Sequence, residues 1–255
     1  MQCLATEEGR AQLEGEYHAM SELQRTVPHL VPSPIACGRF RLASPPTYFF
    51  LIEFVNVSNK LPDPVQLGLR LAELHHKSVS PTGQFGFHIT TYDGNLPHNV
   101  EWNDSWPDFF AKLLHSAYEH DKRINGFWEE LETLFTRVID TVIPRLLGAL
   151  EADGRKIKPC LVHGDLWEGN VGTEYNTGKI YIFDSCAYYA HNEMELGPLT
   201  VDHHRLRAKV YKREYLRHFE ASEPVNEWDD RIRLYSLKEL FINSALFPGS
   251  QVRAR

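Results

Sequence analysis

The sequence predicts an α+β fold with two lobes: a reduced N-terminal β lobe and a larger, mainly helical C-terminal lobe. Three observations support this. Strand-like runs come early in the chain, helical periodicity dominates after residue 56, and a short segment of strands and turns at residues 160–184 interrupts the helices. With 255 residues and 42% hydrophobic content, the chain can bury a sizeable core. We expect residues 1–56 to form the small lobe, with a hinge at 53–56, and residues 57–255 the large lobe.

The small lobe is predicted to contain one helix and one β-hairpin. Apolar side chains recur at helical spacing between Glu7 and Leu23, which favours a helix there, and Glu16 lies beside that apolar stripe. Residues 37–42 and 48–55 are strand-like runs, the second of them rich in aromatic and β-branched side chains. The segment between them contains two prolines, so we expect a hairpin with the prolines in its turn.

The large lobe is predicted to be a series of helices. Asp63 is a good N-cap and Pro64 suits the first helical turn, so a helix should begin there and end near Lys77. Further helices are expected from Ser105, from Phe127 with a break at Pro144, and over 199–219 and 228–246. We expect His203 and His204 to face solvent on one of them. Residues 83–99, rich in glycine, asparagine and aromatic residues, should form a long structured loop.

The chemical signal lies in His163-Gly-Asp-Leu-Trp-Glu-Gly-Asn170, which follows a short apolar run. The order His-x-Asp-Leu-x-x-x-Asn repeats the catalytic loop of protein kinases. There the Asp accepts the proton of the acceptor hydroxyl, and the Asn binds a magnesium ion. Asp165 and Asn170 are therefore the candidate catalytic base and metal ligand.

A hairpin should bring a second metal ligand to this loop. Residues 170–173 and 179–183 have the composition of short strands, and the asparagine and glycine between them favour a turn. The returning strand would place Asp184 beside Asn170, giving the oxygen ligands that magnesium prefers. A single His-x-Asp or Phe-Asp is usually only a turn. The combination of strand, motif, hairpin and Phe-Asp is much rarer and favours a phosphotransferase.

Charge and cysteine content narrow the partners and the compartment. The 27 basic and 34 acidic residues give a net charge of −7, which disfavours nucleic acid and anionic membrane surfaces as partners. We find neither a signal peptide nor a membrane-spanning run. The four cysteines, at positions 3, 37, 160 and 186, form no Cys-x-x-Cys pair, which fits reduced thiols in a cytoplasmic protein.

With these motifs, the sequence resembles the fructosamine and ketosamine 3-kinases, in the aminoglycoside-phosphotransferase branch of the protein-kinase-like fold. The resemblance extends from Glu14 to Arg255. Its most specific parts are the segments 163–170, with Trp167 directly after the motif leucine, and 183–196. Shorter matches occur at 85–87, 94–97 and 106–110.

The resemblance implies an activity: ATP-dependent phosphorylation of the sugar 3-hydroxyl of fructosamine or ribulosamine adducts on protein lysines or small amines, a deglycation repair reaction that uses ATP and Mg2+. It also implies roles for individual residues. These are Asp165 as base, Asn170 and Asp184 as magnesium ligands, Glu16 as partner of a phosphate-binding lysine, Glu53 and Val55 as hinge residues whose backbone contacts adenine, and Trp167 as an apolar wall for the sugar.

One feature departs from the family pattern. The family has a glycine-containing hairpin and a lysine-bearing strand before the Glu16 helix, but the first lysine here is Lys60. Arg10, on the same helix, is a poor substitute. We therefore expect a family member truncated at its N-terminus, with no cationic partner for Glu16. Two alternatives stay open: a related aminoglycoside- or choline-type kinase, or a pseudokinase-like binding module with little activity.

Overall fold

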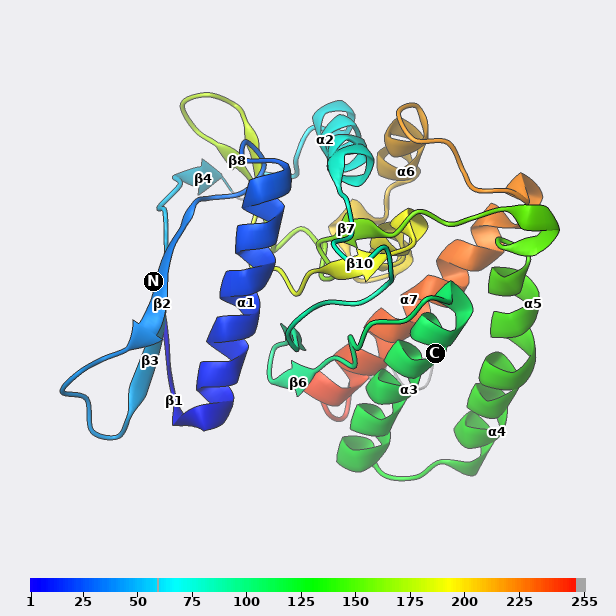
Figure 1. Ribbon diagram of the computed structural model, residues 1–255, viewed down its shortest axis with the longest axis horizontal. Helices are drawn as coiled ribbons and strands as arrows, with labels where there is room; N and C mark the ends of the chain where they lie inside the picture. Colours follow the sequence, from blue (N-terminus) through cyan, green and yellow to red (C-terminus); the bar gives the residue numbers. More distant parts are fainter. Residues whose placement is uncertain (59, 251–255) are drawn as a thin grey trace.

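The structure, a computed structural model, describes residues 1–58 and 60–250. Its N-terminal part is a three-stranded antiparallel sheet with strand order β1-β3-β2, beside the long helix α1 (Thr6–Thr26) (Figure 1). The strands are β1 (Gln2–Ala5), β2 (Pro34–Arg39) and β3 (Thr47–Ile52). Leu13 and Met20 of α1 and Phe50 of β3 are fully buried, so helix and sheet share one apolar core.

The predicted helix and hairpin of this part are confirmed, whereas β1 was not predicted. β2 and β3 pair as expected, with the prolines in the connecting turn. β1 pairs with β3 so that Gln2 lies opposite Phe50 and Ala5 opposite Thr47. Four residues at the start of a chain carry too little periodicity to indicate a strand, and β1 is held by its pairing with β3 rather than by local preference.

The C-terminal part is mainly helical. Its α-helices are α2 (Pro64–Lys77), α3 (Trp106–Asn125), α4 (Glu129–Arg137), α5 (Ile143–Gly148), α6 (Lys209–Leu216) and α7 (Trp228–Leu246). Helices α3 and α7 run side by side (Figure 1). The indole of Trp106 donates a hydrogen bond of 2.9 Å to the hydroxyl of Tyr235 between them.

Helix starts and breaks follow the local signals. The carboxylate of Asp63 caps α2 by accepting from the backbone N–H of Gln66 at 2.9 Å, as predicted. At the predicted break the chain stays helical, because a π-helical turn (Val138–Val142) joins α4 to α5, which contains Pro144. Proline has no N–H to donate, so the regular hydrogen-bond ladder cannot continue through it.

Short strands lie between the two parts. They are β4 (Val57–Ser58), β5 (Tyr92–Asp93), β6 (Leu96–Pro97), β7 (Cys160–Val162), β8 (Val171–Glu174), β9 (Ile180–Ile182) and β10 (Tyr188–Ala190). β8 and β9 form the predicted hairpin, and β7 pairs with β10. β4 pairs with β8, and the backbone N–H of Ile182 donates to the carbonyl of Leu30 at 2.8 Å. The N-terminal part is thus joined to the hairpin by backbone hydrogen bonds.

The prediction for residues 199–219 was wrong. Only α6 is α-helical there, and the preceding residues form short 3₁₀ turns: Asn192–Leu196, Pro198–Thr200 and Arg205–Arg207. Two further 3₁₀ turns are Ala152–Gly154 and Val225–Glu227. His204 is 5% exposed instead of facing solvent, and its Nδ1 lies 2.9 Å from the carbonyl oxygen of Pro198.

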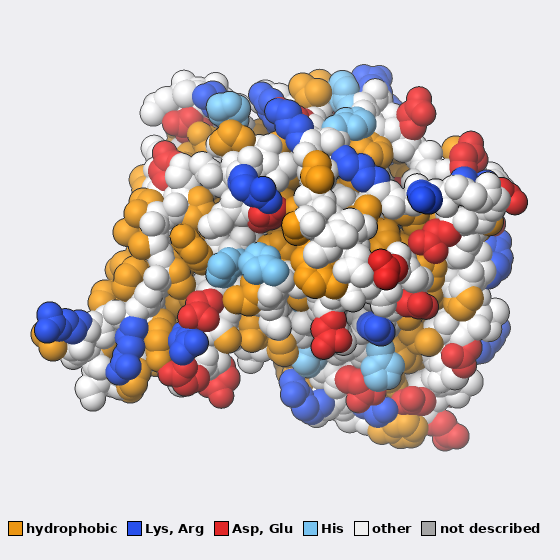
Figure 2. Space-filling view, viewed as in Figure 1, with side chains coloured by type: hydrophobic (Ala, Val, Ile, Leu, Met, Phe, Trp, Pro, Cys, Tyr) orange, Lys and Arg blue, Asp and Glu red, His pale blue; other side chains and the backbone are white. Residues whose placement is uncertain are grey.

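The surface differs between the two parts. On the face in Figure 2, apolar side chains run along the small sheet, while acidic and basic side chains alternate over the helical part. Ile35 and Leu42, at the sheet and its turn, are 58% and 92% exposed. Within the described residues, no helix is long and apolar enough to cross a bilayer. The division into lobes at residue 56 stays a prediction.

Candidate active site

The buried ring of His163 holds together the loop of residues 163–170, the candidate catalytic loop. The loop leaves β7, and the Nε2 of His163 lies 2.9 Å from the carbonyl oxygen of Phe183. Its Nδ1 accepts from the backbone N–H of Asp165 at 3.3 Å. Burial lowers the pKa of His163, so the ring stays neutral, with one donor and one acceptor, as these two contacts require. His163 therefore joins the segment before Asp165 to the segment before Asp184.

Asp165 and Asn170 are in direct contact. The side-chain amide of Asn170 donates to the backbone carbonyl of Asp165 at 2.9 Å and to its Oδ2 at 2.8 Å. Because both bonds use the amide nitrogen, the amide oxygen of Asn170 is left as a potential ligand. Burial raises the pKa of Asp165 well above its usual range, and the charges of Asp93 and Glu239 raise it further.

Asp184 lies at the end of the hairpin with a φ of 57°, in the left-handed region that non-glycine residues seldom adopt. The amide of Gln2 donates to Asp184 Oδ1 at 3.0 Å and to Glu16 Oε1 at 3.1 Å. Burial raises the pKa of Glu16 to about 8, and the charge of Asp184 adds to the effect. The two carboxylates share a neutral amide.

These side chains line one cavity of about 290 Å³, called the first cavity below. Its lining includes Gln2, Glu16, Asp165, Trp167, Asn170 and Asp184. Five residues predicted from the sequence therefore meet in one place. No lysine or arginine is among the described residues that line it.

Glu53 and Val55 do not line the first cavity. They follow β3, where the backbone N–H of Glu53 donates to the carbonyl of Ser33 at 2.9 Å. The Glu53 carboxylate accepts from the N–H of Ser33 at 3.0 Å, which ties the connecting segment to β2. Their contact with adenine stays a prediction.

Trp167 forms part of the wall of the first cavity and is 37% exposed. Its ring stacks on that of His204, with 6.0 Å between centroids and 26° between planes. A Cβ at Gly169 would lie 2.3 Å from this indole, so only glycine fits beneath the ring. This contact gives a physical reason for the Trp-Glu-Gly sequence within the motif.

Glu16 has a partner that was not predicted from the sequence. Gln2 of β1 bonds it directly and bridges it to Asp184. Kinases place a lysine from the strand before this helix in contact with the corresponding glutamate. Arg10 does not take that role, because its guanidinium pairs with Glu7 at 3.2 Å and Glu14 at 2.9 Å. Sequence reasoning missed Gln2 because β1 itself was not predicted.

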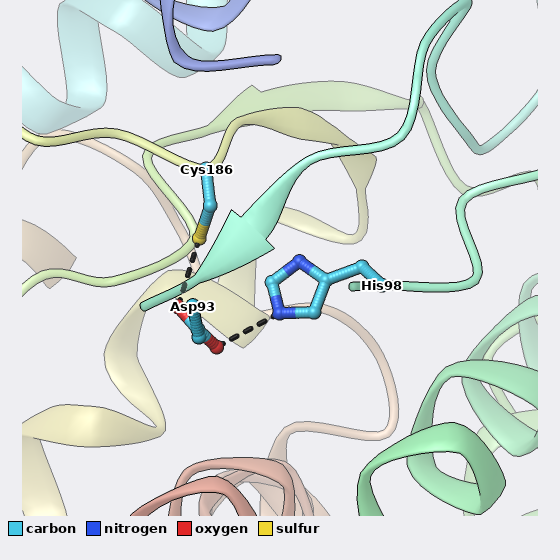
Figure 3. Close-up of side chains that lie close together, drawn as sticks. All are labelled: Asp93, His98 and Cys186. Carbon is cyan, nitrogen blue, oxygen red and sulfur yellow. Dashed lines mark hydrogen bonds and ion pairs between the residues drawn. The ribbon is translucent and has the colours of Figure 1, made fainter. Parts of the chain in front are cut away.

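A second buried cluster, also missed from the sequence, lies against the loop. Figure 3 shows Asp93 between His98, whose Nε2 is 2.8 Å from Oδ2, and Cys186, whose thiol donates to Oδ1 at 3.1 Å. The ammonium of Lys238 also donates to Oδ2. Burial alone would raise the pKa of Asp93, but Lys238 and His98 hold it well below its usual range.

Although Asp93, His98 and Cys186 are close enough to hold a metal ion, the charges argue against one. The Lys238 ammonium already neutralises Asp93 and repels a further cation. Burial raises the pKa of the Cys186 thiol well above its usual range, so it is not the thiolate that binds metals. Lys238 also donates to the carbonyl of Gly164 at 3.2 Å, so the cluster anchors the catalytic loop.

Comparison with known proteins identifies the family. The family model described as fructosamine kinase matches residues 3–255. The chain belongs to the fructosamine kinase family. Over 197 residues it is 32% identical to a chloroplastic protein-ribulosamine 3-kinase of Oryza sativa subsp. japonica, which covers 74% of this chain and 52% of that protein. A Mus musculus ketosamine-3-kinase is 29% identical over 215 residues, covering 74% and 65% of the two chains. The chain therefore spans about half the length of the rice protein.

Solved structures support the fold. A crystal structure from Thermobifida fusca, described as a fructosamine-3-kinase, superposes on this chain with a TM-score of 0.75 at 23% identity. The match covers 98% of this chain and 78% of that one. The GDP complex of an aminoglycoside 2′-phosphotransferase gives 0.56 at 18% identity, with coverages of 98% and 77%. The predicted protein-kinase-like fold of the aminoglycoside-phosphotransferase branch is confirmed.

Proposed function

We propose that this fructosamine kinase family member transfers a phosphate from ATP to the 3-hydroxyl of ketosamines, on protein lysines or small amines. The observation that carries the proposal is the convergence of Asp165, Asn170 and Asp184 on one cavity. The names of the rice and mouse relatives support the substrate class. We also propose the cytoplasm as its location, in keeping with the free thiols of its four cysteines.

The residues present fit a magnesium ion. Asn170 and Asp184 would hold it, since an amide and a carboxylate oxygen are the hard ligands that magnesium prefers. The ion would supply the positive charge that neutralises the phosphates of ATP. No lysine or arginine of the described lining supplies such a charge. The backbone of Glu53 and Val55 is proposed to contact adenine.

Asp165 is proposed as the base. Its raised pKa suits a group that must hold the proton of the attacking hydroxyl near neutral pH. Asn170 fixes the Asp165 carboxylate through the bond to Oδ2, which orients it. Trp167 offers an apolar face for the sugar beside this carboxylate.

A second candidate function is a nucleotide-binding module with little turnover. The observation that favours it is Gln2, a neutral amide where kinases use a lysine. Phosphoryl transfer depends on positioning and charge stabilisation, so this substitution should slow the reaction and weaken ATP binding.

Steady-state transfer from ATP to ribulose-lysine, compared with an aminoglycoside, tests the proposal. We expect magnesium-dependent phosphorylation of ribulose-lysine in preference to the aminoglycoside. Asp165→Asn should lower the rate about 10²–10⁴-fold, because a positioned base contributes roughly that much, while ATP affinity and the melting temperature stay nearly unchanged. Full activity of this variant would remove Asp165 from the mechanism. Magnesium-dependent ATP binding without transfer would favour the second candidate.

A further inference from the structure

A second cavity of about 290 Å³ shares Gly94, Asp165 and Trp167 with the first. It extends from the base toward the C-terminal end of α7. Its other lining residues include Asp93, Glu168, His204 and Glu239. No lysine or arginine is among the described residues that line it. Of its four carboxylates, Asp93 is already paired with Lys238, which leaves Asp165, Glu168 and Glu239 to attract a positively charged ligand.

Glu239 lacks a full set of partners. Glu239 is 4% exposed, and its Oε1 accepts a hydrogen bond from the amide of Asn243 at 2.7 Å. Its Oε2 is buried and has no hydrogen-bond partner among the described residues. A buried carboxylate without a full set of donors is costly, and Glu239 lines the second cavity, so a ligand that brings a donor there would be favoured.

The charge of Lys238 acts to lower the pKa of Glu239, which burial raises, but the hydrogen bonds of Lys238 go to other groups. Lys238 is committed to Asp93 and the carbonyl of Gly164. His204 lies with its Nε2 at 4.0 Å from Glu239 Oε1, but burial lowers the pKa of His204 and its Nδ1 faces the Pro198 carbonyl. A neutral imidazole that donates through Nδ1 presents a lone pair at Nε2. Glu239 Oε1 and His204 Nε2 are thus two acceptors on one wall.

Glu239 and Asp165 line the same cavity, so a cation bound there would be attracted by both carboxylates. Burial raises the pKa of Glu239, while the charge of Lys238 opposes this rise and the charge of Asp93 adds to it.

A ketosamine carries such a cation close to its reacting hydroxyl. Its nitrogen, on C1 of the sugar, is a secondary amine that is protonated near neutral pH and then has two N–H donors. The hydroxyl to be phosphorylated is on C3, a short way along the same chain. With that hydroxyl at Asp165, the ammonium would be within reach of the second cavity, because Asp165 and Glu239 both line it.

We propose that Glu239 binds the protonated amine of the ketosamine in the second cavity and so selects glycated amines over neutral sugars. This inference rests on the proposed function, and the protonated amine is the feature that distinguishes its substrate from a neutral sugar. Glu239 contacts the substrate away from the reacting atoms, so it determines specificity and takes no part in the transfer of the proton.

The test compares fructosyl-lysine with a neutral 1-O-alkyl fructose, in which an ether oxygen replaces the amine. The wild-type protein should prefer the amine. Glu239→Gln keeps the shape but removes the charge, and should raise KM for the amine roughly 10–100-fold, the range for hydrogen bonds to charged groups. The ratio of kcat/KM for the amine to kcat/KM for the ether should fall by the same factor, because any effect of the variant on Asp165 or on ATP is common to both substrates.

Glu168→Gln is the matched control. Glu168 lines the same cavity, but its Oε2 already accepts from the backbone N–H of Arg205 at 2.8 Å. This variant should keep the preference. If Glu239→Gln retains the full preference, or weakens both substrates equally, the inference is wrong.

Calorimetry on the wild-type protein keeps the test independent of turnover and of the folding of any variant. Fructosyl-lysine should bind more tightly than the ether, and equal affinities would overturn the role of Glu239. If neither compound is phosphorylated although the amine binds preferentially, the proposed function fails while the amine site stands.

Discussion

The two cavities that meet at Asp165 are both acidic, but they solve the problem of buried negative charge differently. Beside the second cavity the chain supplies its own cation, since Lys238 pairs with Asp93 deep in the core. In the first cavity Glu16 and Asp184 have only the neutral amide of Gln2 between them. The charge of Asp93 is therefore balanced within the fold, whereas the charge of Glu16 and Asp184 would have to be balanced by ligands.

The largest expected effect comes from removing the internal cation. Lys238→Met leaves Asp93 charged and buried without its ammonium, which should lower the free energy of unfolding by about 3–5 kcal/mol. Chemical denaturation measures it. Adding Asp93→Asn to the same chain should recover most of the loss.

The control is Arg207→Met. Arg207 pairs with Asp202 at 3.2 Å, but the two side chains are 57% and 72% exposed. Exposed pairs contribute about 0–1 kcal/mol, so little change is expected. A similarly small change for Lys238→Met would contradict the contrast between the cavities.

The next largest effect concerns the magnesium ion proposed for the first cavity. Asp184→Ala and Asn170→Ala should each abolish the magnesium-dependent stabilisation by ATP, because each removes an oxygen from the proposed metal site. Ligand at a hundredfold excess over Kd stabilises by about 2.7 kcal/mol, so the thermal shift between magnesium and EDTA is measurable. An unchanged magnesium dependence in the Asp184 variant would refute its assignment.

A cation introduced into the first cavity should make it resemble the second, where the chain supplies its own cation. Gln2→Lys places an ammonium between Glu16 and Asp184, and we expect ATP to bind roughly 10–100-fold more tightly, the range for charged hydrogen bonds. Turnover should rise with it. Gln2→Met, similar in length and uncharged, is the control.

Glu16→Ala extends this test. It should harm the Gln2→Lys protein much more than the parent, because only there does Glu16 orient an ammonium. Equal effects in the two backgrounds would show that Glu16 does not act through residue 2.

The smallest effect tests the wall shared by both cavities. Trp167→Ala should weaken the use of ketosamine more than that of ATP, by roughly tenfold, since an aromatic contact contributes about 0.5–1.5 kcal/mol beyond its buried area. Separate KM values for the two substrates measure it. Equal losses of both, together with a lower melting temperature, would mean that the ring serves only to pack against His204.

The local parts of the site could be predicted from sequence, and the long-range parts could not. Asn170 and Asp184 are joined by one short hairpin, so strand and turn preferences were enough to bring them together. Gln2 and Lys238 reach the site from the two ends of the chain, and neither belongs to a local motif. His204 was misplaced because helical composition around 199–219 was taken for a continuous helix, whereas burial fixed that segment in 3₁₀ turns.

The backbone bonds between the N-terminal part and the hairpin restrict how the cleft can open. β4 is bonded to β8, directly after Asn170, and Leu30 is bonded to Ile182 of β9, just before Asp184. The proposed metal ligands Asn170 and Asp184 are therefore tied to the segments that flank the small sheet. They are also tied to the loop of Asp165, because Asn170 bonds Asp165 and the ring of His163 contacts the carbonyl of Phe183. A movement of the small sheet should therefore leave the relative positions of Asp165, Asn170 and Asp184 nearly unchanged.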